Sequence, residues 1–594
     1  MCGLIAAFTH SVALEPAIRL AMQRMHRRGP DAEGFWQEEG VYLGHRRLAI
    51  LDLDARAAQP MQSSCGRYLI AFNGEIYNFR ELRDALVIQG LEFRTTSDTE
   101  VIIAMFEAEG AAMLPKLHGM FAFVIWDRVE KRGFAARDPY GIKPLYVATT
   151  TAGVLLASQV KALLATCMVS RESDAMGQAG FWMLGSVPEP HTWYRDIKAF
   201  PPGHYAWIDN GQMADAVCWL DIGGIWRDAP TVLLADDVVR AQVRAAVRES
   251  VARHLVADVP VGVFLSGGID SSVLAALMAE AGAHNIQGVT IAYDEFAGTH
   301  EDEAPVAAAV ASHYGIRHHV RRVTREEFIA DLPRIIDAMD QPTVDGINTW
   351  YASKAVAELG LKVVVSGVGG DELFQGYESF EQLPKLVARW RALSRIPGMQ
   401  ALGRFAGKLQ ARRTGNGRWR HAADWASTIS GAWWLRRSLH APEDLPGLMG
   451  TVSATQGLRG FSPQHWVHEM SGPLPRDTKL ALGQIESTTY LRNQLLHDSD
   501  WASMDHSVEL RTPLVDAHLL ASLRAVLPSL HRHAGKRLLA GAPKSPLPSE
   551  IVKRRKTGFG IPVGRWLSNG LGGDIDVGSR GWARDLVARY EDNN

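Results

Sequence analysis

The sequence predicts two domains: an α+β domain of layered antiparallel sheets with helices, then an α/β domain with a parallel sheet and helical additions. Its 594 residues exceed what a single hydrophobic core usually organises. Short apolar runs typical of strands fill residues 1–202, and helix and strand patterns alternate from residue 233 onward. We therefore expect a first domain at 1–202, a linker at 203–232 and a second domain at 233–594.

The composition argues against several classes of protein. Apolar residues make up 46% of the chain and the formal net charge is only −2, so no global feature indicates a nucleic-acid partner. All apolar runs are shorter than the roughly 18 residues that a membrane span needs, and the start "MCGLIAAFTH" lacks the features of a signal peptide. The 4 cysteines have no CxxC spacing, which argues against a disulfide framework or a zinc site. We expect a cytoplasmic protein with no membrane partner.

Four short segments of the first domain predict strands: "YLIAFNGEIY", "MFAFVIWD", "PLYVATT" and "GVLLASQV". Two others, "RELRDALVIQG" and "SDTEVIIAMFEAEG", have the apolar spacing of helices, and Ser97 or Asp98 is placed to cap the second helix. The stretch from Pro201 to Pro230 is rich in turn residues and has no sustained period, so we interpret it as a linker.

The second domain begins with an alternating pattern. A helical pattern in "DDVVRAQVRAAVRESVARHL" precedes an apolar β run in "VPVGVFLSGG" and a further helical pattern in "SSVLAALMAEAG". Such alternation predicts a parallel sheet with helices on both faces.

Cys2 is the first candidate for catalysis. If the initiator methionine is removed, Cys2 carries a thiol nucleophile and a free α-amino group, whose reference pKa of about 8 makes it a usable base. In "NGEIYN", at a strand-to-turn junction, Asn73 and Gly74 offer an amide side chain and a backbone NH, the donors of an oxyanion hole. Arg47 and Asp98 could bind the carboxylate and ammonium of a free amino acid. Taken singly, these features also have structural explanations: a chance cysteine, an Asn-Gly hairpin turn and surface charges.

Together with "RRGPDAEG", "HGMFAF" and "RDPYGIKPLY", these stretches resemble the N-terminal-nucleophile glutaminase (class II glutamine amidotransferase) domain of the glutamine-dependent asparagine synthetase family. The resemblance runs through most of the chain up to residue 160. It implies that Cys2 attacks the side-chain amide of glutamine, that ammonia leaves, and that the thioester is hydrolysed to glutamate. It implies Asn73 and Gly74 as the oxyanion hole, and Arg47, Asn73, Glu75 and Asp98 as the glutamine-binding residues.

The stretch "VGVFLSGGIDSS" contains a candidate phosphate loop, because an apolar β run leads directly into a glycine pair and the head of a helix. Glycines let the backbone wrap an anion, and a helix N-terminus adds NH donors and a favourable dipole. The loop is not a Walker motif, since the Gly-Lys-Ser/Thr ending is absent. It resembles the pyrophosphate loop of ATP pyrophosphatases, which implies cleavage of ATP between its α and β phosphates.

The stretch "LKVVVSGVGGDELFQGY" predicts a second strand that ends in a glycine-rich turn, with Asp371 and Glu372 after the glycines. The carboxyl ends of adjacent parallel strands face one crevice, so Asp270 and Asp371 could hold Mg²⁺ against pyrophosphate oxygens. Lys536 in "GKRLL" and Lys556 in "RRKTGFGIP" are candidates for neutralising charge on the leaving pyrophosphate, and Lys536 is the stronger of the two.

The C-terminal portion, including "DWASMDHSVELRTPLVD", resembles the ATP-pyrophosphatase synthetase domain of the same family. The resemblance implies glutamine, ATP and a small-molecule carboxylate acceptor as partners, with ATP and Mg²⁺ as cofactors. It implies an acyl-adenylate formed on the α-phosphate of ATP, from which ammonia arriving through an internal passage displaces AMP. A homodimer is compatible with it, and no nucleic acid is implied. The implied catalytic residue is Lys536, and the implied ATP-binding residues are Leu265, Ser266, Gly267, Gly268, Asp270, Ser271, Ser272, Thr290, Ile291, Ser366 and Gly367.

Val368 departs from the family's pattern. Many asparagine synthetases have a glutamate at this position of the S-G-x-G loop, and a valine cannot accept a proton. Either another group such as Glu372 takes that role or the acceptor differs from aspartate. The segments "YDEFAGTHEDEAPVA" and "AMDQPTVDGINTWY" also look like a branch associated with modification of sugars or other metabolites.

The leading hypothesis is therefore formation of asparagine from aspartate, glutamine and ATP. The nearest rival is the same chemistry on a uronic acid, a peptide or a natural-product intermediate. A non-catalytic scaffold is disfavoured, because Cys2, Asn73, Asp270 and Asp371 occur together. A β-lactam-forming cyclase is disfavoured too, because an enzyme that uses an internal amine would not need the intact glutaminase residues.

The stretch 385–437 is basic and rich in tryptophan, with Asp424 as its only acid. One interpretation is a set of amphipathic helices that pack Leu and Trp faces on the second domain. Another is a lid or dock for a large anionic acceptor. RNA stacking on the tryptophans is disfavoured, because no RNA-binding motif occurs elsewhere.

Overall fold

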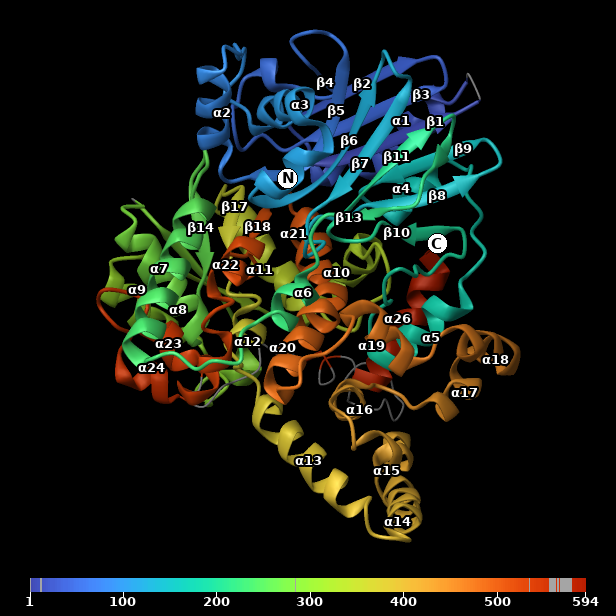
Figure 1. The fold of residues 1–594 in the computed structure, drawn as a ribbon, viewed down its shortest axis with the longest axis vertical. Helices are drawn as coiled ribbons and strands as arrows, with labels where there is room; N and C mark the ends of the chain where they lie inside the picture. Colours follow the sequence, from blue (N-terminus) through green and yellow to red (C-terminus); the bar gives the residue numbers. More distant parts are fainter. Residues whose placement is uncertain are drawn as a thin grey trace.

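The structure is a computed structural model that describes residues 2–10, 13–283, 285–533, 535–554, 562–563, 566 and 579–593. The first domain contains two antiparallel sheets, as the sequence predicts (Figure 1). The six-stranded sheet has the order β10-β8-β9-β1-β3-β2, and the other has the order β12-β11-β7-β6-β5-β4 with β13 paired to β11. Apolar side chains from both sheets, such as Leu4, Leu43 and Val124, form one buried cluster between them.

The strands of the first domain are β1 (Gly3–Thr9), β2 (Ala32–Glu38), β3 (Val41–Arg47), β4 (Met61–Gln62), β5 (Tyr68–Ile76), β6 (Gly119–Asp127), β7 (Arg132–Arg137), β8 (Tyr146–Thr150), β9 (Gly153–Ala157), β10 (Ile197–Ala199), β11 (His204–Asp209), β12 (Gln212–Met213) and β13 (Val217–Cys218). Its helices are α1 (Glu15–Arg24), α2 (Phe79–Ile88), α3 (Asp98–Glu109), α4 (Val160–Ala165) and α5 (Ala175–Leu184). The four predicted strands correspond to β5, β6, β8 and β9, and the two predicted helices to α2 and α3. Ser97 caps α3, since its side chain accepts a hydrogen bond from the Thr99 backbone nitrogen at 3.1 Å.

Strand β11 lies within 203–232, the segment that the sequence analysis interprets as a linker. It pairs antiparallel with β7, so the sheet of the first domain continues past residue 202. Ala206 and Ile208 are buried and alternate with more exposed neighbours. The alternating pattern covers too few residues to be recognised among the turn residues around it. Helix α6 (Ile222–Arg227) follows within the same segment. The domain boundaries stay a prediction.

The second domain is built on a parallel sheet with the order β16-β15-β14-β17-β18. Its strands are β14 (Val261–Phe264), β15 (Gln287–Tyr293), β16 (Arg317–Val323), β17 (Val363–Val365) and β18 (Glu509–Arg511). The predicted alternation is confirmed, since α7 (Asp236–His254), β14 and α8 (Ile269–Glu280) follow one another. Because β14 and β17 are parallel neighbours, the loops at their carboxyl ends lie side by side.

Further helices of the second domain are α9 (Ala304–Tyr314), α10 (Arg325–Ala338), α11 (Ile347–Glu358), α12 (Gly370–Leu373), α17 (Pro446–Met449), α18 (Thr451–Gly460), α19 (Pro463–Ser471), α20 (Thr478–Thr488), α21 (His497–Met504), α22 (Ala517–Leu523), α23 (Lys536–Ala540), α24 (Ser549–Lys553) and α26 (Ser579–Asn593). None of the described helices is long and apolar enough to cross a membrane.

The stretch 385–437 contributes to a projecting set of helices, which we call the arm: α13 (Ser379–Leu393), α14 (Met399–Thr414), the 3₁₀ helix η5 (Gly417–His421), α15 (Ala422–Trp425) and α16 (Ile429–Arg437). Figure 1 shows the arm extending away from the sheets of both domains. Its base is anchored because α13 and α16 both contact α20.

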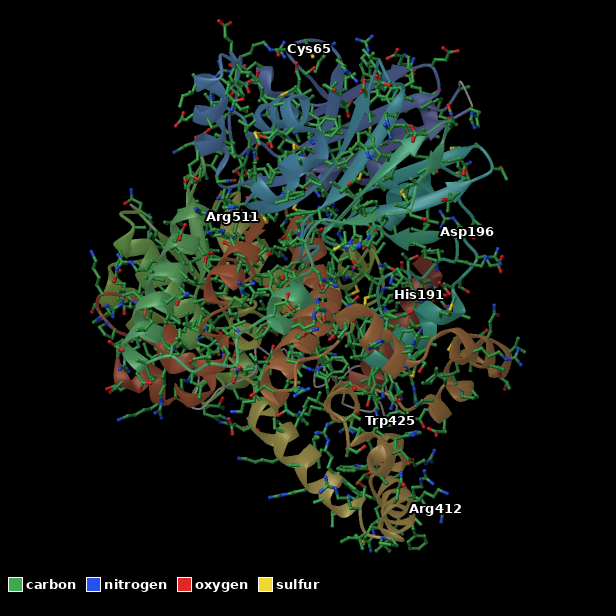
Figure 2. All side chains as sticks on the ribbon, viewed as in Figure 1. Cys65, His191, Asp196, Arg412, Trp425 and Arg511 are labelled. Carbon is green, nitrogen blue, oxygen red and sulfur yellow. The ribbon has the colours of Figure 1, made fainter. Side chains whose placement is uncertain are left out.

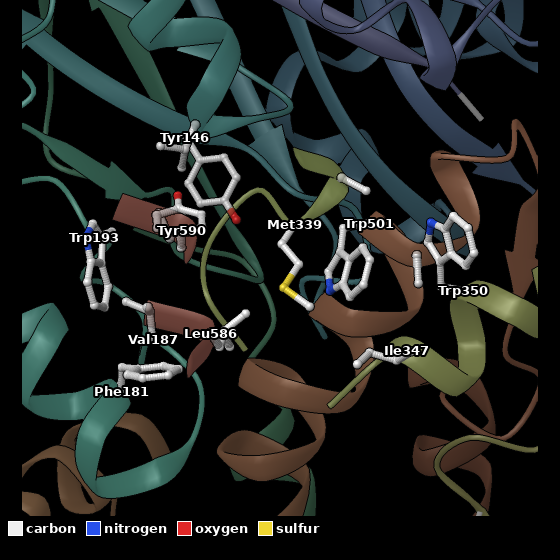
Figure 3. Packing of buried hydrophobic residues seen from close by; sticks show 14 of the residues in the cluster. Tyr146, Phe181, Val187, Trp193, Met339, Ile347, Trp350, Trp501, Leu586 and Tyr590 are labelled. Atoms are coloured by element: carbon white, nitrogen blue, oxygen red, sulfur yellow. The ribbon is translucent and has the colours of Figure 1, made fainter. Parts of the chain in front are cut away.

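The two domains share a buried core, part of which Figure 3 shows. Tyr146 and Trp193 of the first domain lie in the same cluster as Trp501 of α21 and Tyr590 of α26. The rings of Trp193 and Tyr590 are 5.9 Å apart, edge to face, and the Tyr590 hydroxyl donates to the backbone oxygen of Asp340 at 3.0 Å. The C-terminal helix therefore fastens the second domain to the first.

Candidate active sites

The first candidate site is at the N-terminal end of β1, where Cys2 is buried. The backbone nitrogen of Cys2 donates to Oδ1 of Asn73 at 2.9 Å, and Arg28 Nε donates to the Cys2 backbone oxygen at 3.0 Å. Burial raises the pKa of the Cys2 thiol, so the nucleophile needs a base close by. A free α-amino group at Cys2 would sit on the same carbon that carries the thiol side chain.

Asn73 and Gly74 lie inside β5, where the sequence analysis expected a strand-to-turn junction. The Asn-Gly pair usually indicates a turn, but pairing with β6 continues to Ile76 and overrides that preference. A Cβ atom at Gly74 would lie 2.2 Å from the Met120 backbone oxygen, so only glycine allows this close approach. The Asn73 Nδ2 atom is buried and has no hydrogen-bond partner among the described residues. It is a donor available to an oxyanion.

Arg47 and Asp98 flank this site. Arg47 donates from Nη1 to the Asp54 backbone oxygen at 2.8 Å and from Nη2 to the Leu51 oxygen at 3.2 Å, so its guanidinium is held by the loop after β3. Asp98 accepts a hydrogen bond from the Ile76 nitrogen at 3.0 Å. Burial raises the pKa of Asp98 to about 6.

Glu75 contacts the second domain. Its Oε2 atom lies 3.2 Å from Arg511 Nη2 at the end of β18, and Oε1 has no hydrogen-bond partner among the described residues. Arg511 also donates from Nε to Glu509 at 2.6 Å and from Nη1 to the His254 backbone oxygen at 2.7 Å. Sequence reasoning missed Arg511, although it lies in the quoted stretch "DWASMDHSVELRTPLVD".

The second candidate site is a crevice of about 530 Å³ at the carboxyl ends of β14 and β17. Asp270, Asp371 and Lys536 meet there. Lys536 Nζ contacts both carboxylate oxygens of Asp270 and lies 2.8 Å from Asp371 Oδ1. Burial disfavours the ammonium, but the two carboxylates more than offset this and hold the pKa of Lys536 above its ordinary value. Three residues that the sequence analysis selected from distant segments are thus in direct contact.

The carboxylates of Asp270 and Asp371 fit a divalent cation, because they already converge on one cationic atom, Lys536 Nζ. Mg²⁺ typically takes one or two carboxylates together with substrate phosphates and water. Within the described ranges, no group of three or more His, Cys, Asp or Glu side chains forms a complete metal site. Phosphate oxygens or water would therefore have to complete the coordination.

The phosphate loop forms one wall of the crevice through Ser266, Gly267 and Gly268. The Ser266 nitrogen donates to the Ser271 hydroxyl at 3.1 Å, which closes the loop onto the first turn of α8. A Cβ atom at Gly267 would lie 2.0 Å from Arg554 Nη1, so this guanidinium lies directly against the loop. Arg554 was not selected from the sequence, where it is one of several cations in "VKRRK".

Some of the expected ATP-binding positions do not line this crevice. Gly367 does, and a Cβ there would lie 2.8 Å from the Asp270 Cβ. The other positions are buried behind the wall, and these are Leu265, Ser271, Ser272, Thr290, Ile291 and Ser366. Lys556 lies outside the described residues.

Burial and the neighbouring Asp371 charge raise the pKa of Glu372 to about 7. Among the described residues that line the crevice, it is the only carboxyl group with a pKa of about 7. Its Oε1 accepts a hydrogen bond from the Tyr377 hydroxyl at 2.6 Å, and its Oε2 has no hydrogen-bond partner in the described part of the chain. Val368 lines the same crevice. A proton-exchanging carboxyl group is therefore present despite the valine.

The crevice is also lined by groups that sequence reasoning did not select. Asp345 and Asp498 line it, and burial together with the Asp498 charge raises the pKa of Asp345 to about 6. Tyr490 lines it too, with the Arg437 guanidinium 3.6 Å above its ring. Asp345 belongs to the quoted segment "AMDQPTVDGINTWY", which was the available signal.

A small cavity of about 20 Å³ lies between the domains. Its lining includes Arg28, which binds the Cys2 backbone oxygen, and Asp500, which Arg28 Nη1 contacts at 2.6 Å. Ile142 contributes from the first domain, and Trp501 of α21 from the second. The volume is enough for one water-sized molecule.

Two family models match this chain, a glutamine amidotransferase domain over residues 1–219 and asparagine synthase over residues 242–576. A Mycobacterium tuberculosis protein, provisionally named an asparagine synthetase (glutamine-hydrolyzing), is 33% identical over 96% of this chain and 89% of its own length. Asparagine synthetase (glutamine-hydrolyzing) 1 of Bacillus subtilis is 29% identical over 99% and 90%. A protein named amidase chyE from Penicillium rubens is 27% identical over 89% and 83%.

Proposed function

This chain belongs to the glutamine-hydrolysing asparagine synthetase family, and we propose that it transfers the amide nitrogen of glutamine to the side-chain carboxylate of aspartate. It is a ligase-type amidotransferase whose domains use glutamine and ATP. The proposed products are asparagine, glutamate, AMP and pyrophosphate. The proposal for aspartate and for each residue's role extends beyond the family assignment.

In the proposed first reaction, the Cys2 thiol attacks the side-chain amide carbon of glutamine, and the Cys2 α-amino group takes the thiol proton. The Asn73 Nδ2 and Gly74 NH groups stabilise the oxyanion, and the unpartnered Nδ2 supports this role. Arg47 and Asp98 bind the α-carboxylate and α-ammonium of glutamine. Loss of ammonia leaves a thioester, which water hydrolyses to glutamate.

In the proposed second reaction, the acceptor carboxylate attacks the α-phosphate of ATP and pyrophosphate leaves. The loop from Ser266 to Gly268 binds phosphate oxygens through backbone NH groups, and Arg554 adds a positive charge beside it. When bound, Mg²⁺ would be held by Asp270 and Asp371 and would supply charge neutralisation for the leaving pyrophosphate. With the metal on these carboxylates, Lys536 would be free to contact the phosphates. Ammonia then attacks the acyl carbon of the acyl-adenylate and AMP leaves, while Glu372 accepts a proton from the ammonia.

Ammonia has to reach the acyl-adenylate without equilibrating with water, where at neutral pH it would become ammonium. The cavity between the domains supports an internal route, because Arg28 belongs to its lining and contacts Cys2. This cavity would be one part of the ammonia passage.

The observation that carries the proposal is the convergence of Asp270, Asp371 and Lys536 beside the phosphate loop. The test is a screen of carboxylate acceptors in which pyrophosphate release is measured with glutamine and ATP. Aspartate-dependent release of AMP and pyrophosphate is expected. Release of ADP and phosphate would contradict the proposed reaction.

Val368 favours a second candidate, amidation of another carboxylate such as a uronic acid, a peptide or a natural-product intermediate. It lies in the crevice wall, where its side chain cannot exchange a proton. The same screen separates the candidates, because only the true acceptor will stimulate pyrophosphate release.

A further inference from the structure

The arm encloses a cavity of about 720 Å³ that is separate from the residues of both candidate active sites. One wall comes from α13, and the others come from α14, η5, α15 and α16. Its volume lies within the range of pockets that hold small organic ligands, about 300–1,000 Å³. Its apolar lining consists mainly of Leu383, Leu386, Trp390, Trp419, Ala422, Ala426, Ala432 and Leu435.

Two glycines of α14 shape this cavity. A Cβ atom at Gly403 would lie 2.7 Å from the ring of Trp390, and one at Gly407 would lie 2.3 Å from the Trp419 backbone oxygen. Trp390 belongs to α13 and Trp419 to η5, so α14 approaches both neighbours closely at positions where it has no side chain. The cavity is thus framed by specific close contacts.

The cavity also has a cationic rim. Lys385, Arg389 and Arg436 are exposed, Arg418 is half-buried, and no acid belongs to the described lining. Lys385 pairs with Glu381 at 3.7 Å, whereas Arg389 and Arg436 form no ion pair with any described residue. Because the chain as a whole has a net charge of −2, this concentration of positive charge is local.

Arg418 lies deepest among these cations. Among the described residues, its guanidinium donates only a long hydrogen bond of 3.4 Å to the Leu435 backbone oxygen, and it is close to Arg436 and Arg580. Burial and these two guanidinium groups lower the pKa of Arg418. An anion bound at the rim would supply the missing counter-charge.

We infer that this cavity binds a single-chain anionic amphiphile, whose apolar chain fills the space between α13 and α14 and whose carboxylate or phosphate contacts Arg389, Arg418 and Arg436. The cationic rim favours an anionic head group, and the apolar interior favours a hydrocarbon chain, so an anionic amphiphile fits both features. A free nucleotide would place polar groups against the apolar lining, and a folded partner protein would not enter a space of this volume. The inference concerns a site apart from amide synthesis, so it stands or fails independently of the proposed function.

The test is isothermal titration of the full chain with dodecanoate and with dodecyl phosphate, each below its micelle concentration. We expect 1:1 binding, and the stronger of the two identifies the head group. A neutral dodecyl maltoside should bind at least about tenfold more weakly, because charge-assisted hydrogen bonds to the rim are lost. Equal binding of the neutral and the anionic ligands would overturn the inference.

The matched variants separate the rim from general positive charge. Arg389→Gln with Arg436→Gln should weaken binding at least about tenfold, whereas Arg412→Gln with Arg413→Gln should leave it within about twofold. Arg412 and Arg413 are exposed cations of α14 that do not line the cavity, and Figure 2 shows Arg412 near the far end of the arm. Equal losses in both pairs would show a nonspecific charge effect and overturn the site.

A third variant fills the cavity without altering its charge. Ala406 is exposed and lines the opening, so Ala406→Trp should block both amphiphiles while the melting temperature stays within a few degrees. Unchanged affinity in Ala406→Trp would contradict the assigned cavity. Binding to phosphatidylglycerol vesicles without binding to monomeric dodecanoate would also overturn the inference, since a membrane surface would then be the partner.

Discussion

Arg511 Nη2 lies 3.2 Å from Glu75 Oε2, so the last residue of β18 in the second domain is ion-paired with a residue of β5 in the first. Figure 2 shows Arg511 where the two domains meet. Burial disfavours its charge, but Glu509 and Glu75 more than offset this and hold the pKa of Arg511 above its ordinary value. The pair thus joins the glutaminase motif to the sheet that carries the phosphate loop.

Replacement of Arg511 should destabilise the protein strongly. In Arg511→Met, Glu75 and Glu509 would stay buried without their partner, and loss of one member of a buried pair typically costs about 3–5 kcal/mol. Urea unfolding followed by fluorescence should show a clearly lower midpoint. The control is Arg404→Gln, whose exposed pair with Asp424 should contribute about 0–1 kcal/mol. Equal urea midpoints for both variants would show that the Arg511 ion pairs do not stabilise the fold.

Cys2→Ala should abolish hydrolysis of glutamine and preserve amide formation from ammonium salts. The reason is that Cys2 and the phosphate loop belong to different domains. Glutamate release and pyrophosphate release measure the two reactions separately. Cys65→Ala is the control, since Cys65 is an exposed cysteine whereas Cys2 is buried. Glutamine hydrolysis at the wild-type rate in Cys2→Ala would show that another group is the nucleophile.

Asp371→Asn should lower synthesis with either nitrogen source and leave glutamine hydrolysis nearly unchanged. Loss of one strong electrostatic contact to the transition state often lowers kcat by about 10²–10³. The measurement is AMP formation with glutamine and with ammonium chloride. Asp209→Asn, at an exposed position of β11, is the control. A fully active Asp371→Asn enzyme would exclude this carboxylate from the metal site.

Tyr377→Phe should shift the pH dependence of synthesis. The pKa of Glu372 is about 7, and the Tyr377 hydroxyl lowers it by stabilising the carboxylate. Without that hydroxyl the pKa of Glu372 rises, so the acidic limb of the kcat profile should move to higher pH by about 1 unit. The profile is measured with ammonia corrected for its own protonation. An unmoved limb in Tyr377→Phe would show that Glu372 is not the titrating base.

The fold was predictable wherever a segment carries its own period. The runs that form β5, β6 and β14 have β-forming residues bounded by turn residues, and α3 also has a capping serine in its sequence. Strand β11 could not be found in this way, because it is short and depends on pairing with β7. Its neighbours in the chain favour turns.

In the candidate sites too, residues within local sequence motifs were predictable, and residues that depend on distant contacts were not. Local motifs contain Cys2, Asn73 and Asp270, and these were selected from the sequence. Arg511 and Arg554 act through segments remote in the chain, so no spacing within their own segments indicates their contacts. The raised pKa of Glu372 depends on burial, which only the folded chain provides.

The link between Glu75 and Arg511 also sets an order of assembly during translation. At about 5–20 residues per second, the ribosome completes the strands of the first domain tens of seconds before β18 emerges. Until then the Glu75 carboxylate lacks its cationic partner, and we expect a ribosome-stalled chain that ends before β18 to hydrolyse glutamine poorly. A nascent chain would therefore release little ammonia before the domain that consumes it has been made.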